Sequence, residues 1–156
     1  MRKTLIKALL KAGRDVEIHV TGRCMEPLLR QTDKVKVKAC EALDIGDICL
    51  IDAGKEGLYL HRLVKREGGA LITKGDFEGK HECIRKENMI GVLEAIKVQG
   101  SNAWKTLDMT RDEGARIAKW SWMIDPASGL GGERRRAIRE QIWHANEIAR
   151  EKLTGD

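Results

Sequence analysis

The sequence predicts a mainly β protein with a short N-terminal helix and a C-terminal helical extension. Between residues 15 and 99, apolar residues alternate with polar ones or gather in short runs between turn-forming residues, and helical periodicity is absent. Apolar residues outside this region recur at helical spacing. We therefore divide the chain into a basic amphipathic helix (1–14), a β domain (15–99) and a helical extension (100–156).

Length and composition are those of a soluble, folded protein. The chain has 156 residues, of which 42% are hydrophobic and 34% are charged, enough for one domain with a core and an appendage. No apolar run approaches the roughly 20 residues that a membrane span needs. The first residues also lack the apolar core of a signal peptide. We expect a cytoplasmic protein.

The predicted first helix has an apolar face and a basic face. Its basic residues are Arg2, Lys3, Lys7, Lys11 and Arg14. With no acid among residues 1–14, their charge of +5 equals the net charge of the chain. We expect this helix to pack on the domain, and peripheral contact with an anionic membrane or an acidic partner is the alternative. Because the charges of the remaining residues sum to zero, no nucleic-acid partner is expected.

Six segments of the central region have the length and pattern of β-strands. They are residues 16–20, 34–40, 47–52, 58–64, 70–74 and 89–98. Gly, Asp and Lys-rich turns separate them. Short strands at this spacing predict a compact β domain.

The last third of the chain predicts two helices and contains all four tryptophans. A capping box formed by Thr110 and Glu113 predicts a helix that runs to about Ile124. Segment 125–132, which contains Pro and four Gly or Ser residues, ends this helix, and a second helix follows over residues 133–153. Amphipathic helices of this length have to bury their apolar stripes on each other, on the β domain or in an oligomer.

Six motifs of the central region carry a resemblance to a known family. In chain order they read GRCMEPLL (22–29), TDKVKV (32–37), IGDICLI (45–51), LHRLV (60–64), ITKGD (72–76) and MIGVLEAI (89–96). Their order resembles the signal peptidase I and LexA-type protease superfamily. The likeness is closest to the branch of archaea, the endoplasmic reticulum and some spore-forming bacteria, whose pattern runs Gly-x-Ser-Met-x-Pro, Gly-Asp-x-Val, His-Arg-Val and Thr-Lys-Gly-Asp. Each motif is weak alone, but six in unbroken order make a strong signal.

The resemblance implies a role for several residues. The nucleophilic serine of the family falls on Cys24, and the histidine base of this branch falls on His61. Met25 and Pro27 match the residues that shape the nucleophile turn, and Asp76 matches the conserved acid of the Lys-Gly-Asp turn. We expect Asp76 to hold that turn, and orienting the histidine is its alternative role.

A third catalytic member stays open between two neighbours. The further acid of the family lies a few residues after the Lys-Gly-Asp turn, and at the shorter spacing found here either His81 or Glu82 can take its place. Arg62 supports the placement of His61, since the two form the family's His-Arg pair. No metal and no cofactor is expected.

The sequence departs from the family in three ways. Cysteine replaces serine, and a Cys–His pair is sound chemistry because a thiol forms its nucleophilic anion far more readily than a hydroxyl does. Gly22 replaces the hydroxyl residue two positions before the nucleophile, with Thr21 one step further away, which removes one oxyanion donor. We also expect a protein without the usual membrane anchor of the family.

The expected function is that of a soluble, signal-peptidase-like cysteine peptidase. It would cleave a peptide or protein precursor, bound as an extended strand, through a dyad of Cys24 and His61. One alternative is a non-catalytic peptide-binding or regulatory module on the same fold, in which Cys24 is inert or redox-sensing. The other is a repressor-type protein whose C-terminal helices bind nucleic acid. No motif supports the three other cysteines as nucleophiles, and Cys49, in the apolar run ICLI, is expected to be a core residue.

Overall fold

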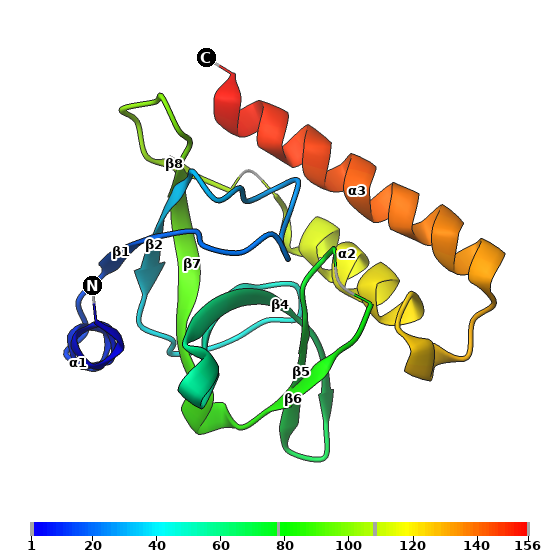
Figure 1. Cartoon of the computed structure of the whole chain (residues 1–156), viewed down its shortest axis with the longest axis horizontal. Helices are drawn as coiled ribbons and strands as arrows, with labels where there is room; N and C mark the ends of the chain where they lie inside the picture. Colours follow the sequence, from blue (N-terminus) through cyan, green and yellow to red (C-terminus); the bar gives the residue numbers. More distant parts are fainter. Residues whose placement is uncertain (1, 78, 108, 156) are drawn as a thin grey trace.

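The fold is a mainly antiparallel β-sheet flanked by helices at both ends of the chain, which confirms the predicted fold class (Figure 1). The computed structural model describes residues 2–77, 79–107 and 109–155. Within these ranges the sheet has eight strands in the order β1-β2-β7-β3-β4-β5-β6, and β8 pairs with β7.

The elements follow one another along the chain in a regular order. The strands are β1 (Val16–His19), β2 (Lys34–Lys38), β3 (Ile48–Asp52), β4 (Leu58–Glu67), β5 (Ala70–Lys74), β6 (Glu82–Ile84), β7 (Met89–Lys97) and β8 (Lys105–Thr106). The α-helices are α1 (Lys3–Lys11), α2 (Arg111–Met123) and α3 (Gly132–Thr154). Single 3₁₀ turns cover Gly54–Glu56, Lys86–Asn88 and Pro126–Ser128.

The six expected strands and the three expected helices are all present, with ends that differ by a few residues. The capping prediction for α2 is confirmed, because the Thr110 hydroxyl accepts a hydrogen bond from the Glu113 N–H at 3.1 Å. The sequence analysis missed β6 and β8. These strands have three and two residues, too few to show an alternating pattern.

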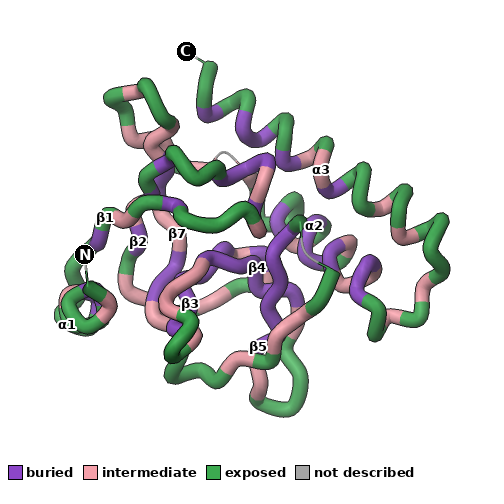
Figure 2. The backbone as a smooth tube through the Cα atoms, in the orientation of Figure 1, coloured by how far each residue is buried: buried purple, intermediate pink, exposed green. Residues whose placement is uncertain are grey.

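One hydrophobic cluster joins the sheet to both ends of the chain. Ile6 and Leu10 of α1 and Ala149 and Leu153 of α3 belong to the same cluster as the inward-facing residues of β1 and β2. The buried positions of α3 face the rest of the molecule, and its outer side is exposed (Figure 2). The terminal helices therefore close the core of the sheet instead of standing apart from it.

The last helix is also tied to the loops beneath it by buried polar contacts. Arg150 donates hydrogen bonds to the Asp33 carboxylate at 2.6 and 3.1 Å and to the Leu28 carbonyl at 2.8 Å. One turn earlier, the Asn146 amide donates to the Asp76 carboxylate at 3.0 Å. Two loops far apart in the sequence are thus held by one helix.

No helix within the described ranges combines the length and the apolar character that crossing a membrane requires.

Truncating Arg150 tests the contribution of this buried contact. Arg150→Ala leaves the Asp33 carboxylate buried without its cation, so we expect a loss of about 3–5 kcal/mol in the free energy of unfolding, measured by urea denaturation. Arg139→Ala, on the exposed side of the same helix, is the control and should change it little. Adding Asp33→Asn to Arg150→Ala should recover part of the loss. An equal effect of the two single variants would contradict the bracing role of Arg150.

Candidate active site

The turn that carries Cys24 is anchored by its apolar neighbours. Met25, Leu28 and Leu29 are almost completely buried in the core below the sheet edge, and Pro27 is buried with them. The side chain of Cys24 is only half-buried. Because the residues after it are fixed in the core, the thiol is held at the surface in a defined place.

His61 comes to this thiol from the middle of β4. Cys49 of β3 is the neighbour of His61 across the ladder, and His61 as a whole residue is 4% exposed. The imidazole makes a hydrogen bond with Cys24. The Cys24 thiol also lies 3.5 Å from the carbonyl oxygen of Leu60, the residue before His61.

A carboxylate completes the row on the far side of the imidazole. The Glu82 Oε1 atom at the start of β6 lies 2.5 Å from His61 Nδ1. Sulfur, imidazole and carboxylate therefore follow one another from the Cys24 turn, through β4, to β6. This is the order in which nucleophile, base and orienting acid stand in a catalytic triad.

The surroundings of His61 favour its protonated form. Burial lowers the pKa of the imidazole, but the hydrogen bonds to Cys24 and Glu82 and the negative charge of both groups outweigh burial and raise the pKa to about 9. His61 is therefore mainly an imidazolium at neutral pH, between two potential anions.

The Lys-Gly-Asp turn packs against this row so closely that only glycine fits at its centre. A Cβ atom at Gly75 would lie 2.7 Å from the Cys24 Cβ, 2.8 Å from the Cys24 carbonyl oxygen and 3.2 Å from His61 Nε2. Two residues later, the Phe77 N–H donates to the Cys24 carbonyl at 2.9 Å. Nε2 of His61 thus faces the space between the Cys24 turn and Gly75.

Asp76 holds this turn in place and does not serve His61. Its carboxylate accepts hydrogen bonds from Arg62 Nε at 2.9 and 3.1 Å and from Arg62 Nη2 at 2.7 Å, and both side chains are completely buried. Asn146 of α3 donates to the same carboxylate. The first of the two roles expected for Asp76 is the one that these contacts fit.

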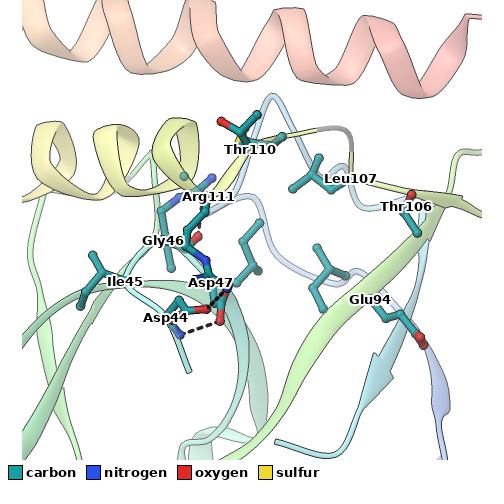
Figure 3. Close-up of a pocket in the computed structure, with 14 residues that line it drawn as sticks. Asp44, Ile45, Gly46, Asp47, Glu94, Thr106, Leu107, Thr110 and Arg111 are labelled. Atoms are coloured by element: carbon teal, nitrogen blue, oxygen red, sulfur yellow. Dashed lines mark hydrogen bonds and ion pairs between the residues drawn. The ribbon is translucent and has the colours of Figure 1, made fainter. Parts of the chain in front are cut away.

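Arg62 also lines a cavity on the other side of its ion pair with Asp76. Its Nη1 donates to the Gly46 carbonyl at 2.8 Å, in the wall of a cavity of about 310 Å³ between the 44–48 loop, β7 and the start of α2 (Figure 3). Asp44, Asp47 and Arg111 are among the residues that line this cavity. Its described lining residues include no cysteine, serine or histidine, so the row of Cys24, His61 and Glu82 is the better candidate site.

The other candidate for the third member, His81, belongs to a separate cluster. Its backbone N–H and its Nδ1 bind the Asp125 carboxylate at 2.7 and 2.9 Å, and its ring packs on Trp122 at a centroid distance of 5.2 Å. Burial raises the pKa of Asp125, but hydrogen bonds from the Ala127 N–H and His81 outweigh it and lower the pKa. Of the two neighbours left open by the sequence, Glu82 contacts His61.

A groove beside Cys24 runs between two strand edges. It holds a cavity of about 240 Å³ lined by residues 18–22 on one side and 58–60 on the other. Its aliphatic lining residues are Ile18, Val20, Leu29, Leu50, Leu58 and Leu60. In the described sheet β1 is the end strand and pairs with β2 alone, and β5 pairs with β4 only from Arg62 onward. The groove therefore lies between the outer edge of β1 and a stretch of β4 that β5 does not cover.

Sequence reasoning missed the contribution of α3 to the site. Asn146 and Arg150 lie among the buried residues of a helix stripe that also includes Ile142 and Ala149. Polar residues inside an apolar stripe have to find partners when they are buried. That pattern signals buried polar contacts, although it does not name their partners.

Comparison of the chain with protein-family models, with curated proteins and with solved structures found no match. Among the described residues, no group of three or more His, Cys, Asp or Glu side chains is arranged to hold a metal ion. Geometry and the motifs of the sequence therefore carry the functional argument.

Replacing Glu82 tests its link to His61. Glu82→Gln removes the negative charge and leaves only a weaker, neutral acceptor, so the pKa of His61 should fall below about 9 in an NMR titration. Because the folded-state pKa lies above the ordinary 6.5, this pairing stabilises the fold fully below about pH 6.5 and its contribution is lost as the pH rises through about 9. His81→Gln and the exposed Glu87→Gln should leave the titration unchanged. An unaltered pKa in Glu82→Gln would remove Glu82 from the row.

Adding one methyl group at Gly75 tests the close packing around the thiol. Gly75→Ala should push the turn away from Cys24 and His61 and slow alkylation of Cys24 by iodoacetamide at pH 7 by on the order of 10-fold or more. Gly79→Ala is the matched control, since a Cβ there meets no atom within 4 Å. Peptide mapping by mass spectrometry separates Cys24 from the other thiols. Equal alkylation rates in both variants would show that the contact at Gly75 does not position the thiol.

Proposed function

We propose that the protein is a cysteine peptidase of the signal-peptidase type that cleaves a peptide or protein precursor. The observation that carries the proposal is the row of three side chains beside a groove: the Cys24 thiol, the His61 imidazole that contacts it, and the Glu82 carboxylate 2.5 Å from His61 Nδ1. The ordered motifs of the sequence support it, because they place the nucleophile and base of that family on Cys24 and His61.

In the proposed reaction, the Cys24 thiolate attacks the scissile carbonyl carbon and a sulfur–carbon bond forms. His61, which holds the proton taken from the thiol, gives it to the leaving nitrogen as the carbon–nitrogen bond breaks. The amine product departs and a thioester remains on Cys24. Water then attacks the thioester while His61 takes its proton, and the acid product and the thiol of Cys24 are released.

Glu82 is a positioning residue in this scheme. Its carboxylate at Nδ1 fixes the ring of His61 so that Nε2 points to the thiol, and it stabilises the imidazolium that exists between the two proton transfers. The raised pKa of His61 supports this role, since a neighbouring anion favours the charged ring.

The substrate in this proposal is an extended segment that lies in the groove beside Cys24. The outer edge of β1 offers backbone groups to a peptide, which is binding by strand addition, and residues 58–60 form the opposite wall. The aliphatic lining of the 240 Å³ cavity favours apolar side chains before the cut. The reaction needs Cys24 as a reduced thiol, a state that fits the cytoplasm.

Substitution at the dyad tests the proposal directly. Wild type and variants are incubated with a proteome-derived peptide library, and cleavage is read by mass spectrometry. Cys24→Ala should abolish cleavage, and Cys24→Ser should lower it by on the order of 10²-fold or more, because a hydroxyl is far less acidic than a thiol. His61→Ala should be inactive at pH 7 and recover part of its activity at higher pH, where the thiolate forms unaided.

Cys83→Ser is the matched control, because Cys83 is an exposed free thiol, and it should retain activity. Full activity of His61→Ala at pH 7 would remove His61 from the mechanism. A wild-type protein that binds peptides of the library without cutting them would instead point to a non-catalytic binding module.

A further inference from the structure

Two aromatic side chains lie together beside the Cys24 turn. Phe77 follows the Lys-Gly-Asp turn and is 49% exposed, and its ring centroid lies 5.4 Å from that of Trp143 on α3, with 57° between the planes. Single exposed apolar residues are common on protein surfaces and need no explanation. This pair differs from such residues, because it is a preformed contact between two elements at the candidate site.

The backbone ties Phe77 to the nucleophile. The Phe77 N–H donates to the Cys24 carbonyl at 2.9 Å, so the two residues lie side by side. Trp143 is held from the other direction, because Asn146, three residues further along α3 on the same face, binds the Asp76 carboxylate. The aromatic pair is therefore tied to the same segments that hold Cys24.

The position of His61 tells which part of a substrate this pair would meet. The leaving nitrogen takes its proton from His61 Nε2, which lies 3.2 Å from the Cβ position of Gly75. The segment that leaves must therefore start near Gly75, two residues from Phe77. The cavity of 240 Å³ is lined by residues 18–22 and 58–60, and neither Phe77 nor Trp143 is among its lining residues. It would therefore serve the other side of the scissile bond.

We propose that Phe77 and Trp143 bind the substrate residues that directly follow the scissile bond, and select an aromatic or large aliphatic side chain there. An extended chain advances about 3.3 Å per residue, which places the selected side chain within about the first three residues after the cut. The substrate class is a precursor whose released C-terminal part begins with an apolar segment. This inference rests on the proposed peptidase function.

The test uses the full-length protein and a proteome-derived peptide library, with new N-termini identified by mass spectrometry. Wild-type cut sites should be enriched in Phe, Tyr, Trp and Leu in the first three positions after the cut. Phe77→Ala combined with Trp143→Ala should lose the enrichment, and kcat/KM for a preferred peptide should fall about five- to tenfold. The loss should be smaller for a matched peptide with Gly at that position.

Two further variants separate this role from a general effect on the fold. Phe77→Ala alone removes a half-exposed ring and should shift the preference in the same direction. Ile148→Ala, which changes a side chain 43% exposed on the same helix, should keep the wild-type preference. Cleavage without enrichment, or enrichment that survives in the double variant, would overturn the inference and leave the peptidase function standing. Failure of the wild type to cut any peptide would overturn both.

Discussion

The buried ion pair of Arg62 and Asp76 is the contact on which the rest of the candidate site depends. Arg62 follows His61 on β4, and Asp76 follows Gly75, so the pair joins the strand that carries His61 to the turn that packs against Cys24. A buried charge without a partner is strongly unfavourable. Moving the two segments apart would separate the buried charges, so the pair opposes movement between them.

The helical extension completes this arrangement instead of merely covering it. Asn146 adds a donor to the Asp76 carboxylate, and Arg150 binds the Asp33 carboxylate and the Leu28 carbonyl, close to the Cys24 turn. The two loops that must meet at the thiol are thus fixed to one rigid helix. Rigid support of this kind is what keeps a catalytic group within the small tolerance that reaction geometry allows.

Much of the fold could be predicted from the sequence, because strand alternation and the Thr110 cap are local signals. Cys24 and His61 could be named from ordered motifs. The choice between His81 and Glu82 could not be made from the sequence. Successive residues of an extended chain point to opposite sides, and counting residues does not tell which side faces His61. The partnership of Asn146 with Asp76 spans 70 residues and leaves no local pattern.

The open strand edges of the groove have a consequence for solubility. A sheet edge that would receive a substrate strand, as proposed, could equally receive a strand of another copy, which is how edge strands promote aggregation. The chain limits this hazard in two ways: β1 has only four residues, and its Glu17 and His19 are not buried. The proposed capture of a substrate strand and resistance to self-association would thus place opposite demands on the same short edge.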